Sequence, residues 1–306
     1  MLQPPFHNAL VLTGPTGSGK TALGIELAER LRADIVAMDS MTLYRGMDIG
    51  TAKPTAAEGG RVAHHLIDVL EPWESASVAW WLERAAATCR DIEARGKRVL
   101  FVGGTPLYLK ALLFGLFDGP GADPTVRHRL SEESVKMGAA HLHARLAAID
   151  PATAARLHPN DVRRVIRALE VWEVTGRPIS GWQQQWNNEQ KADPGRTILY
   201  LDLPRQQLYE RINRRVLQMM AAGLLDEVRA LRALPRPMSR EAAQALGYKE
   251  IFDHLDGRAT LDEAIERIQT RSRNFAKRQL TWFRRLPGCR PVSPELTFAV
   301  WDLTMG

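Results

Sequence analysis

Residues 14–21 read GPTGSGKT and match the phosphate-binding pattern G-x-x-x-x-G-K-[ST] at every fixed position. The apolar run at residues 9–12 precedes this segment, and a helical pattern at residues 20–32 follows it. In such a strand–turn–helix context, backbone N–H groups and the positive end of the helix dipole point at bound phosphate. Lys20 adds a mobile cation, and Thr21 adds a hydroxyl group for Mg²⁺. The residues predicted to bind a di- or triphosphate are Gly14, Pro15, Thr16, Gly17, Ser18, Gly19, Lys20 and Thr21.

The order of apolar and helical patterns predicts the fold class. Short β-rich runs occur at residues 9–12, 35–38, 99–102 and 197–203, with helical patterns at 20–32 and 77–95 between them. Alternation of strands and helices is typical of a parallel sheet covered by helices. We therefore predict an α/β fold, with a parallel-sheet core like that of P-loop nucleoside-triphosphate hydrolases.

A long stretch between the third and fourth β-rich runs reads as helices only. One helix is predicted to begin at Asp123-Pro124, and another spans residues 161–175 and ends at Gly176. More helices are predicted after the fourth run, at residues 206–234, 239–252 and 261–285. The expected organisation is a core of residues 1–121 and 194–306, with an all-helical inserted domain at residues 122–193.

Composition limits the classes of function. The chain has 306 residues, of which 45% are hydrophobic, and we see neither an apolar run long enough to span a bilayer nor a secretion signal at the N-terminus. Cys89 and Cys289 lie far apart and have no metal-ligand spacing, so we expect reduced thiols and a cytoplasmic protein without a membrane partner. The net charge of +6 suggests a polyanionic partner.

A basic run near the C-terminus points to the same kind of partner. Residues 267–285 contain seven basic side chains and no acidic one. On a helix, Arg267, Arg271, Arg278 and Arg285 share one face, which is either a solvated surface or a contact for a phosphate backbone.

Polar residues follow two of the predicted strands. Asp39 and Ser40 come after the second strand, where ligands bind in open α/β sheets. Three roles compete for Asp39: a base that holds or deprotonates a nucleophile, a carboxylate that positions Mg²⁺, and a cap for a turn. Gly103, Gly104 and Thr105 follow the third strand and form either a ligand-binding rim or a plain turn.

Other candidate residues have both a structural and a functional interpretation. Arg127 is either a solvated side chain or a cation that closes over a diphosphate, and the arginines among residues 163–167 suit an RNA stem. Tyr248 is either a half-buried core tyrosine or a platform for a base. The pair His64-His65 has no partner at metal spacing, which favours a structural role.

With these residues assembled, the chain resembles the tRNA dimethylallyltransferase family (isopentenyl-diphosphate:tRNA transferases) in its bacterial form. The resemblance covers nearly the whole chain in order, and the pairing of GMDIGTAKP with GGTPLYLKAL is its most specific part. The matching segments are GPTGSGKT (14–21), MDSMTLYRGMDIGTAKPT (38–55), HHLIDVLEP (64–72), VGGTPLYLKALL (102–113), ADPTVR (122–127), HPNDVRRVIRALEV (158–171), ALGYKE (245–250) and AKRQLTWFRR (276–285).

The resemblance implies transfer of a dimethylallyl group from dimethylallyl diphosphate to N6 of the adenosine 3′ to the anticodon, in tRNAs that read codons beginning with U. It implies that the phosphate loop binds the donor diphosphate with Mg²⁺ held at Thr21, and that Asp39 is the general base. Lys20, Thr105 and Arg127 then complete the catalytic set.

The resemblance also implies contacts with the anticodon stem-loop. The residues that match the tRNA-contacting segments, with the basic run added, are Asp39, Ser40, Met41, Thr42, Arg163, Arg164, Val165, Ile166, Arg167, Gln244, Ala245, Leu246, Gly247, Tyr248, Lys249, Lys277, Arg278 and Arg284. A monomer is sufficient for this activity. The alternative is a nucleotide-binding phosphotransferase or hydrolase that uses ATP, and the donor preference separates the two.

Overall fold

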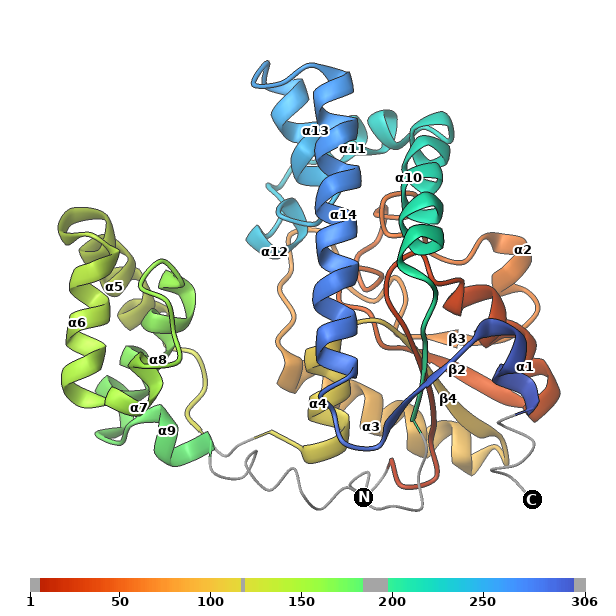
Figure 1. Ribbon diagram of the computed structural model, residues 1–306, viewed down its shortest axis with the longest axis horizontal. Coiled ribbons are helices and arrows are strands. Elements are labelled where there is room, and N and C mark those ends of the chain that lie inside the picture. The colour runs from red at the N-terminus through yellow and green to blue at the C-terminus, as the bar shows by residue number, and fades with distance from the viewer. Residues whose placement is uncertain (1–5, 117–118, 184–197, 300–306) are drawn as a thin grey trace. The chain divides into compact units, whose positions relative to one another are not determined.

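The computed structural model describes residues 6–116, 119–183 and 198–299 (Figure 1). Its centre is a parallel sheet of six strands in the order β3-β2-β4-β1-β5-β6. The strands are β1 (Leu10–Thr13), β2 (Ala33–Ala37), β3 (His64–His65), β4 (Arg98–Gly103), β5 (Ile198–Leu201) and β6 (Cys289–Val292). Four of them correspond to the predicted runs, whereas the edge strands β3 and β6 were not predicted.

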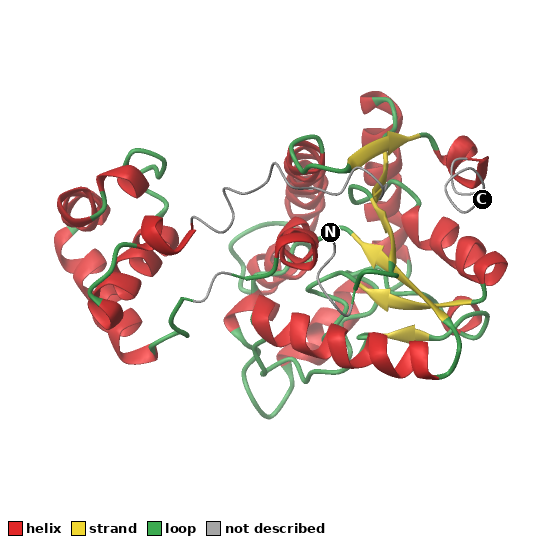
Figure 2. Cartoon of the chain, turned by 90° about the horizontal axis from the view of Figure 1, so that it is seen from below, coloured by secondary structure: helices red, strands yellow, loops and turns green. Residues whose placement is uncertain are grey.

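Helices cover both faces of the sheet because neighbouring residues of a strand point to opposite sides. In β4, Leu100 packs in the core that includes Ile25 and Ala28 of α1 (Lys20–Leu31). The next residue, Phe101, packs against Trp81 of α3 (Val78–Ala94). Figure 2 shows the strands with helices on either side. The fold class predicted from the sequence is confirmed.

The helices after β5 differ from the prediction at two glycines. The expected helix at residues 206–234 is divided into α10 (Arg205–Ala221) and α11 (Leu224–Arg232) at Gly223, which has a φ of 98°. The expected helix at residues 239–252 is divided into α12 (Arg240–Ala243) and α13 (Tyr248–Leu255) at Gly247, which has a φ of 97°. Such positive φ angles are easy for glycine and end the regular helix.

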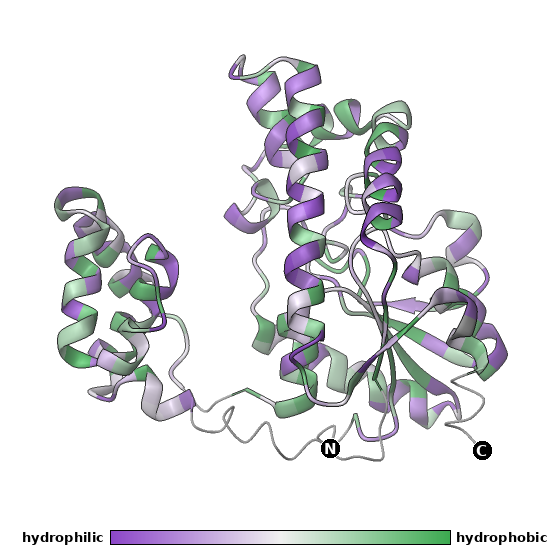
Figure 3. Cartoon of the chain, viewed as in Figure 1, coloured by the Kyte–Doolittle hydropathy of each residue, from purple (hydrophilic) through white to green (hydrophobic). Residues whose placement is uncertain are grey.

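The long helix α14 (Leu261–Phe283) packs beside both α10 and α13 (Figure 1). It carries hydrophilic residues along its length, whereas the sheet strands are largely hydrophobic (Figure 3). The short elements α2 (Ala56–Gly59) and α4 (Pro106–Phe114) and the 3₁₀ turn η3 (Pro294–Leu296) complete this part of the chain.

The chain divides into two compact units, which are Met1–Leu113 with Ala192–Gly306, and Phe114–Lys191. The second unit begins before the predicted residue 122, and the predicted boundary at residue 193 lies outside the described residues. Its helices are α5 (Pro124–Met137), α6 (Ala139–Ile149), α7 (Pro151–Ala154), α8 (Val162–Thr175) and α9 (Ile179–Trp182). They enclose a core of their own that includes Leu130, Leu146, Val165 and Leu169.

Candidate active site

The phosphate loop has the backbone that its sequence predicts. Gly17 and Gly19 have φ angles of 80° and 88°, and Gly19 precedes the first residue of α1. A Cβ atom on Gly17 would lie 2.7 Å from Ile212 Cγ1, so this position has no room for a side chain. Ser18 is buried, and among the described residues its Oγ has no hydrogen-bond partner. A loop of this shape at a helix N-terminus can accept an anion.

Lys20 lies in the wall of a cavity of about 170 Å³ at the carboxyl ends of β1, β2 and β4. Its Nζ donates to the Pro15 carbonyl at 3.4 Å. Burial lowers the pKa of Lys20 to about 8; nearby Asp39 opposes the shift and Arg215 adds to it. The ammonium group is therefore poorly compensated, and a bound anion would stabilise its charged form.

Arg215 is a second cation that the sequence analysis missed. It lies on α10, donates to Thr16 Oγ1 at 2.8 Å and lines the same cavity as Lys20. Burial lowers its pKa, and the charge of Asp39 partly offsets this. Arg215 is one of several arginines in α10, and from the sequence all of them look solvated. Only the folded structure shows that Arg215 lines the cavity.

Asp39 and Thr105 meet at the same edge of the sheet. Asp39 Oδ1 accepts from the N–H of Met41 at 2.9 Å, so the carboxylate does cap a turn. Within the described part of the chain, its second oxygen has no hydrogen-bond partner. Thr105 Oγ1 accepts from the N–H of Ser40 at 3.1 Å, which ties the two strand ends together. Both residues line the cavity, which leaves Asp39 able to accept a proton there.

Gln279 of α14 is another residue that the sequence analysis missed. Its side chain is 2% exposed, its Nε2 donates to the Gly104 carbonyl at 2.6 Å, and its Oε1 accepts from the N–H of Thr16 at 2.9 Å. It therefore joins the phosphate loop to the loop after β4. The sequence signal was its spacing with Ile268, Ser272 and Phe275, which places a glutamine on the cavity-lining face of a basic helix.

The segment at residues 244–249 contributes to the cavity through Ala245, Leu246 and Gly247. Tyr248 is fully buried, and its hydroxyl donates to Glu227 Oε1 at 2.6 Å. The hypothesis that Tyr248 stacks on a base is therefore wrong, because no face of its ring is available. The ring packs instead against Gly50, where an added Cβ would lie 2.5 Å from it.

The basic run of α14 is only partly free of acidic partners. Arg271 forms an ion pair with the buried Glu250, and Arg273 donates to Asn213. Arg284 lies 3.4 Å from Asp202, whereas Lys277 and Arg278 are exposed. The run appeared unopposed because its acidic partners lie on other elements, Glu250 on α13 and Asp202 just after β5. The contact of Lys277 and Arg278 with the tRNA backbone stays a prediction.

In the helical unit, two of the predicted tRNA contacts are core residues. Val165 and Ile166 are 0% and 8% exposed, so their side chains cannot reach a ligand at the surface of this unit. Arg163 and Arg164 are exposed on the same helix. Arg127 and Arg167 both pair with the buried carboxylate of Glu170, at 3.0 Å and 2.8 Å. The predicted roles of these four arginines stay predictions.

His64 lines the cavity, whereas His65 and the two cysteines do not. His65 contacts the buried Asp34 at 3.1 Å, and His64 Nδ1 lies 2.8 Å from the Val62 carbonyl. Burial raises the pKa of both cysteine thiols to about 12. Groups of three or more potential metal-binding His, Cys, Asp or Glu side chains are absent from the described ranges. No helix among the described residues is long and apolar enough to cross a membrane.

Comparison with known proteins supplies further evidence. The family model described as IPP transferase matches residues 42–286, and the one described as isopentenyl transferase matches residues 7–66. The chain is 48% identical to a tRNA dimethylallyltransferase of Geobacter metallireducens over 277 residues, covering 90% of this chain and 89% of the relative. It is 47% identical to the Geobacillus kaustophilus protein of that name, covering 90% and 86%.

Two solved structures are similar to this chain. One is a tRNA isopentenylpyrophosphate transferase from Bacillus halodurans, with 41% identity, a TM-score of 0.67 and coverage of 97% of this chain and 94% of that chain. The other is a eukaryotic dimethylallyltransferase acting on tRNA, with 27% identity, a TM-score of 0.74 and coverage of 97% and 76%.

Proposed function

Since the chain belongs to the IPP transferase family, we propose that it transfers a dimethylallyl group from dimethylallyl diphosphate to N6 of the adenosine 3′ to the anticodon in tRNAs that read codons beginning with U. The observation that supports this reaction is that residues of the phosphate loop, two partly buried cations and a carboxylate line one cavity. The cations suit a diphosphate leaving group, and the carboxylate suits an amine that must lose a proton.

The donor is held by its diphosphate. The N–H groups of the phosphate loop other than those of Thr16 and Ser18, which already donate to Gln279 and to the Pro15 carbonyl, bind the phosphate oxygens together with the N-terminus of α1. Lys20 and Arg215 balance the phosphate charge. Thr21 lines the cavity, and its hydroxyl is an oxygen ligand of the kind that suits Mg²⁺ bound mainly through substrate phosphates. When bound, Mg²⁺ would neutralise part of the charge that develops on the diphosphate, and Thr21 would hold it.

The acceptor is an exocyclic adenine amine whose lone pair is delocalised into the ring. The adenosine must leave its stack to enter the cavity. A bond then forms between N6 and C1 of the dimethylallyl group while the bond from C1 to the diphosphate oxygen breaks. Asp39 takes the proton that N6 loses, and Thr105 keeps the end of β2 in place through Ser40. The products are N6-dimethylallyladenosine and diphosphate.

We further propose that the protein acts as a monomer in the cytoplasm and that its basic residues contact the tRNA backbone. Arg163, Arg164 and Arg167 of the helical unit, with Lys277, Arg278 and Arg284, would supply these contacts, and Arg127 would add charge at the diphosphate. Replacing any one of these basic side chains with a neutral one should reduce the salt dependence of tRNA binding, if that side chain contacts a phosphate.

A transfer assay tests the proposed function. Purified protein, Mg²⁺, unmodified tRNA and radiolabelled dimethylallyl diphosphate are mixed, and label in the tRNA is measured. A parallel reaction contains labelled ATP. Label should enter tRNA from the isoprenoid donor. Turnover of ATP without incorporation of isoprenoid would instead support the phosphotransferase or hydrolase alternative.

A further inference from the structure

Glu227 of α11 contacts a loop that lies far from it in sequence. Its Oε2 accepts from the N–H groups of Asp48 at 3.0 Å and Ile49 at 2.7 Å. Its Oε1 accepts from the N–H of Gly50 at 3.2 Å and from the hydroxyl of Tyr248 at 2.6 Å. Four donors thus converge on one carboxylate, and charge-assisted hydrogen bonds of this kind are stronger than neutral ones.

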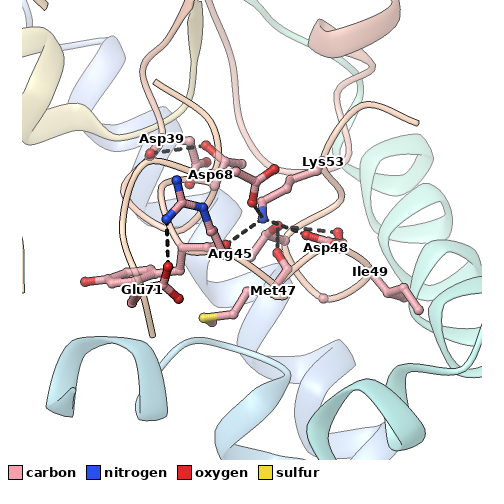
Figure 4. A network of polar contacts seen from close by, with 12 residues as sticks. Asp39, Arg45, Met47, Asp48, Ile49, Lys53, Asp68 and Glu71 are labelled. Atoms are coloured by element: carbon pink, nitrogen blue, oxygen red, sulfur yellow. Dashed lines mark hydrogen bonds and ion pairs between the residues drawn. The ribbon is translucent and has the colours of Figure 1, made fainter. Parts of the chain in front are cut away.

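The loop that Glu227 binds forms part of the cavity wall through Gly50, Thr51 and Ala52. Ala52 has a φ of 53°, a left-handed conformation that costs a non-glycine residue about 1–3 kcal/mol and persists only where the surroundings impose it. Lys53, the next residue along the chain, stabilises the loop, since its Nζ contacts Asp48 at 2.6 Å and Asp68 at 2.5 Å (Figure 4). Glu227 stabilises the same loop from a distant helix through its hydrogen bonds to the three backbone N–H groups.

The fourth donor connects Glu227 to a second part of the wall. Tyr248 is the first residue of α13 and directly follows Gly247, which lines the cavity with Ala245 and Leu246. Gly247 is itself held by Glu250, whose Oε2 accepts its N–H at 2.8 Å. Through Tyr248, the carboxylate of Glu227 therefore links residues 48–52 to residues 245–247, and both segments line the cavity that contains Asp39.

We propose that Glu227 is a positioning residue that fixes the acceptor side of the cavity. This inference rests on the proposed function, because residues 245–247 belong to a segment predicted to contact tRNA. Glu227 does not line the cavity, so it acts through the two segments that it joins. The phosphate loop has its own supports, Gln279 and Arg215, and among the described contacts none of these involves Glu227.

Glu227→Gln tests this inference because it changes the charge and one acceptor with little change in shape. A glutamine offers one acceptor oxygen, and its NH₂ group would face N–H groups that need an acceptor. With donor saturating, kcat/KM for tRNA should fall on the order of tenfold to a hundredfold, since small misplacements at a reacting centre have effects of this size. The KM for dimethylallyl diphosphate should stay within about twofold. Glu227→Asp should recover part of the loss.

Asp34→Asn is the matched control. The Asp34 side chain is 1% exposed and pairs with Lys97 at 2.7 Å and His65 at 3.1 Å, but it does not line the cavity. This control should lower the melting temperature while its kinetic constants, measured well below that temperature, stay within about twofold of wild type.

Three outcomes would overturn the inference. In the first, Glu227→Gln lowers the melting temperature but leaves kcat/KM for tRNA unchanged. In the second, the variant lowers kcat/KM for the donor and kcat/KM for tRNA equally. In the third, the wild-type chain transfers no label, which would overturn the proposed function as well. The first two leave the proposed function standing, so the two failures are distinguishable.

Discussion

Two of the loops that line the cavity reach their backbone conformations in different ways. In the phosphate loop, the positive φ angles fall on Gly17 and Gly19, which adopt them at little cost. In the loop at residues 48–52, the positive φ falls on Ala52, and three backbone N–H groups depend on Glu227, 179 residues from Asp48. A conformation that glycine favours can be read from sequence, whereas one that distant contacts impose becomes visible only in the fold.

The largest expected effect belongs to Asp39, whose carboxylate lies in the cavity that both loops line. Asp39→Asn keeps the shape of the side chain and the contact with the Met41 N–H but removes the base. Transfer should fall about 10²–10⁴-fold, the usual contribution of general base catalysis. The turnover rate with saturating tRNA and donor measures this loss, and tRNA affinity by filter binding should change little. Full transfer by the variant would exclude Asp39 as the base.

The next effect concerns the phosphate loop alone. Lys20→Met removes a partly buried cation, so kcat/KM for dimethylallyl diphosphate should fall about 10²–10³-fold, as expected for loss of one group that stabilises a developing anion. Affinity for tRNA should be unaffected, which is the reverse of the pattern expected for Glu227→Gln. If both variants change the same kinetic constant, the two loops do not serve separate substrates.

The pH dependence of donor use should also follow Lys20. Because burial lowers its pKa to about 8, this ammonium group is charged below pH 8 and loses its proton above it. Only the charged form attracts the diphosphate, so kcat/KM for the donor should fall about tenfold per pH unit above pH 8. Rates measured from pH 7 to 9.5 test this. Lys20→Arg should lose the inflection, since arginine stays protonated, and a wild-type profile that is flat to pH 9.5 would contradict the assignment.

Gly50→Ala probes the second loop with a smaller expected effect. The added Cβ would lie 2.5 Å from the Tyr248 ring, so one wall must shift. We expect a loss of stability of about 1–3 kcal/mol from overpacking, measured by denaturant unfolding, and a lower kcat/KM for tRNA.

Gly59→Ala is the control for Gly50→Ala, because nothing lies within 4 Å of an added Cβ there. Tyr248→Leu combined with Gly50→Ala should restore part of the stability by making room. If the two alanine variants behave alike, the contact between Gly50 and Tyr248 is not rigid.

The same contrast explains what the sequence could predict. The phosphate loop, the place of Asp39 and four strands follow from local patterns. β6 was missed because it is a short edge strand that contains Pro291, and proline weakens a strand pattern. Arg215, Gln279 and Glu227 were missed because polar residues in amphipathic helices look solvated until tertiary packing turns them toward the cavity or its walls.

The smallest expected effect tests the strain in the second loop. Ala52→Gly removes the cost of a left-handed alanine, about 1–3 kcal/mol, but adds about 0.5–1 kcal/mol of backbone entropy to the unfolded chain. The net result should be a gain of about 1 kcal/mol, or a rise in Tm of about 2–4 °C. Ala57→Gly, in the helix α2, should instead lower stability, because alanine is unstrained there. A loss of stability in both variants would mean that Ala52 carries no strain. If Glu227 imposes that strain, Ala52→Gly should also restore part of the tRNA kcat/KM lost in Glu227→Gln, because a loop that adopts its conformation freely depends less on its external brace.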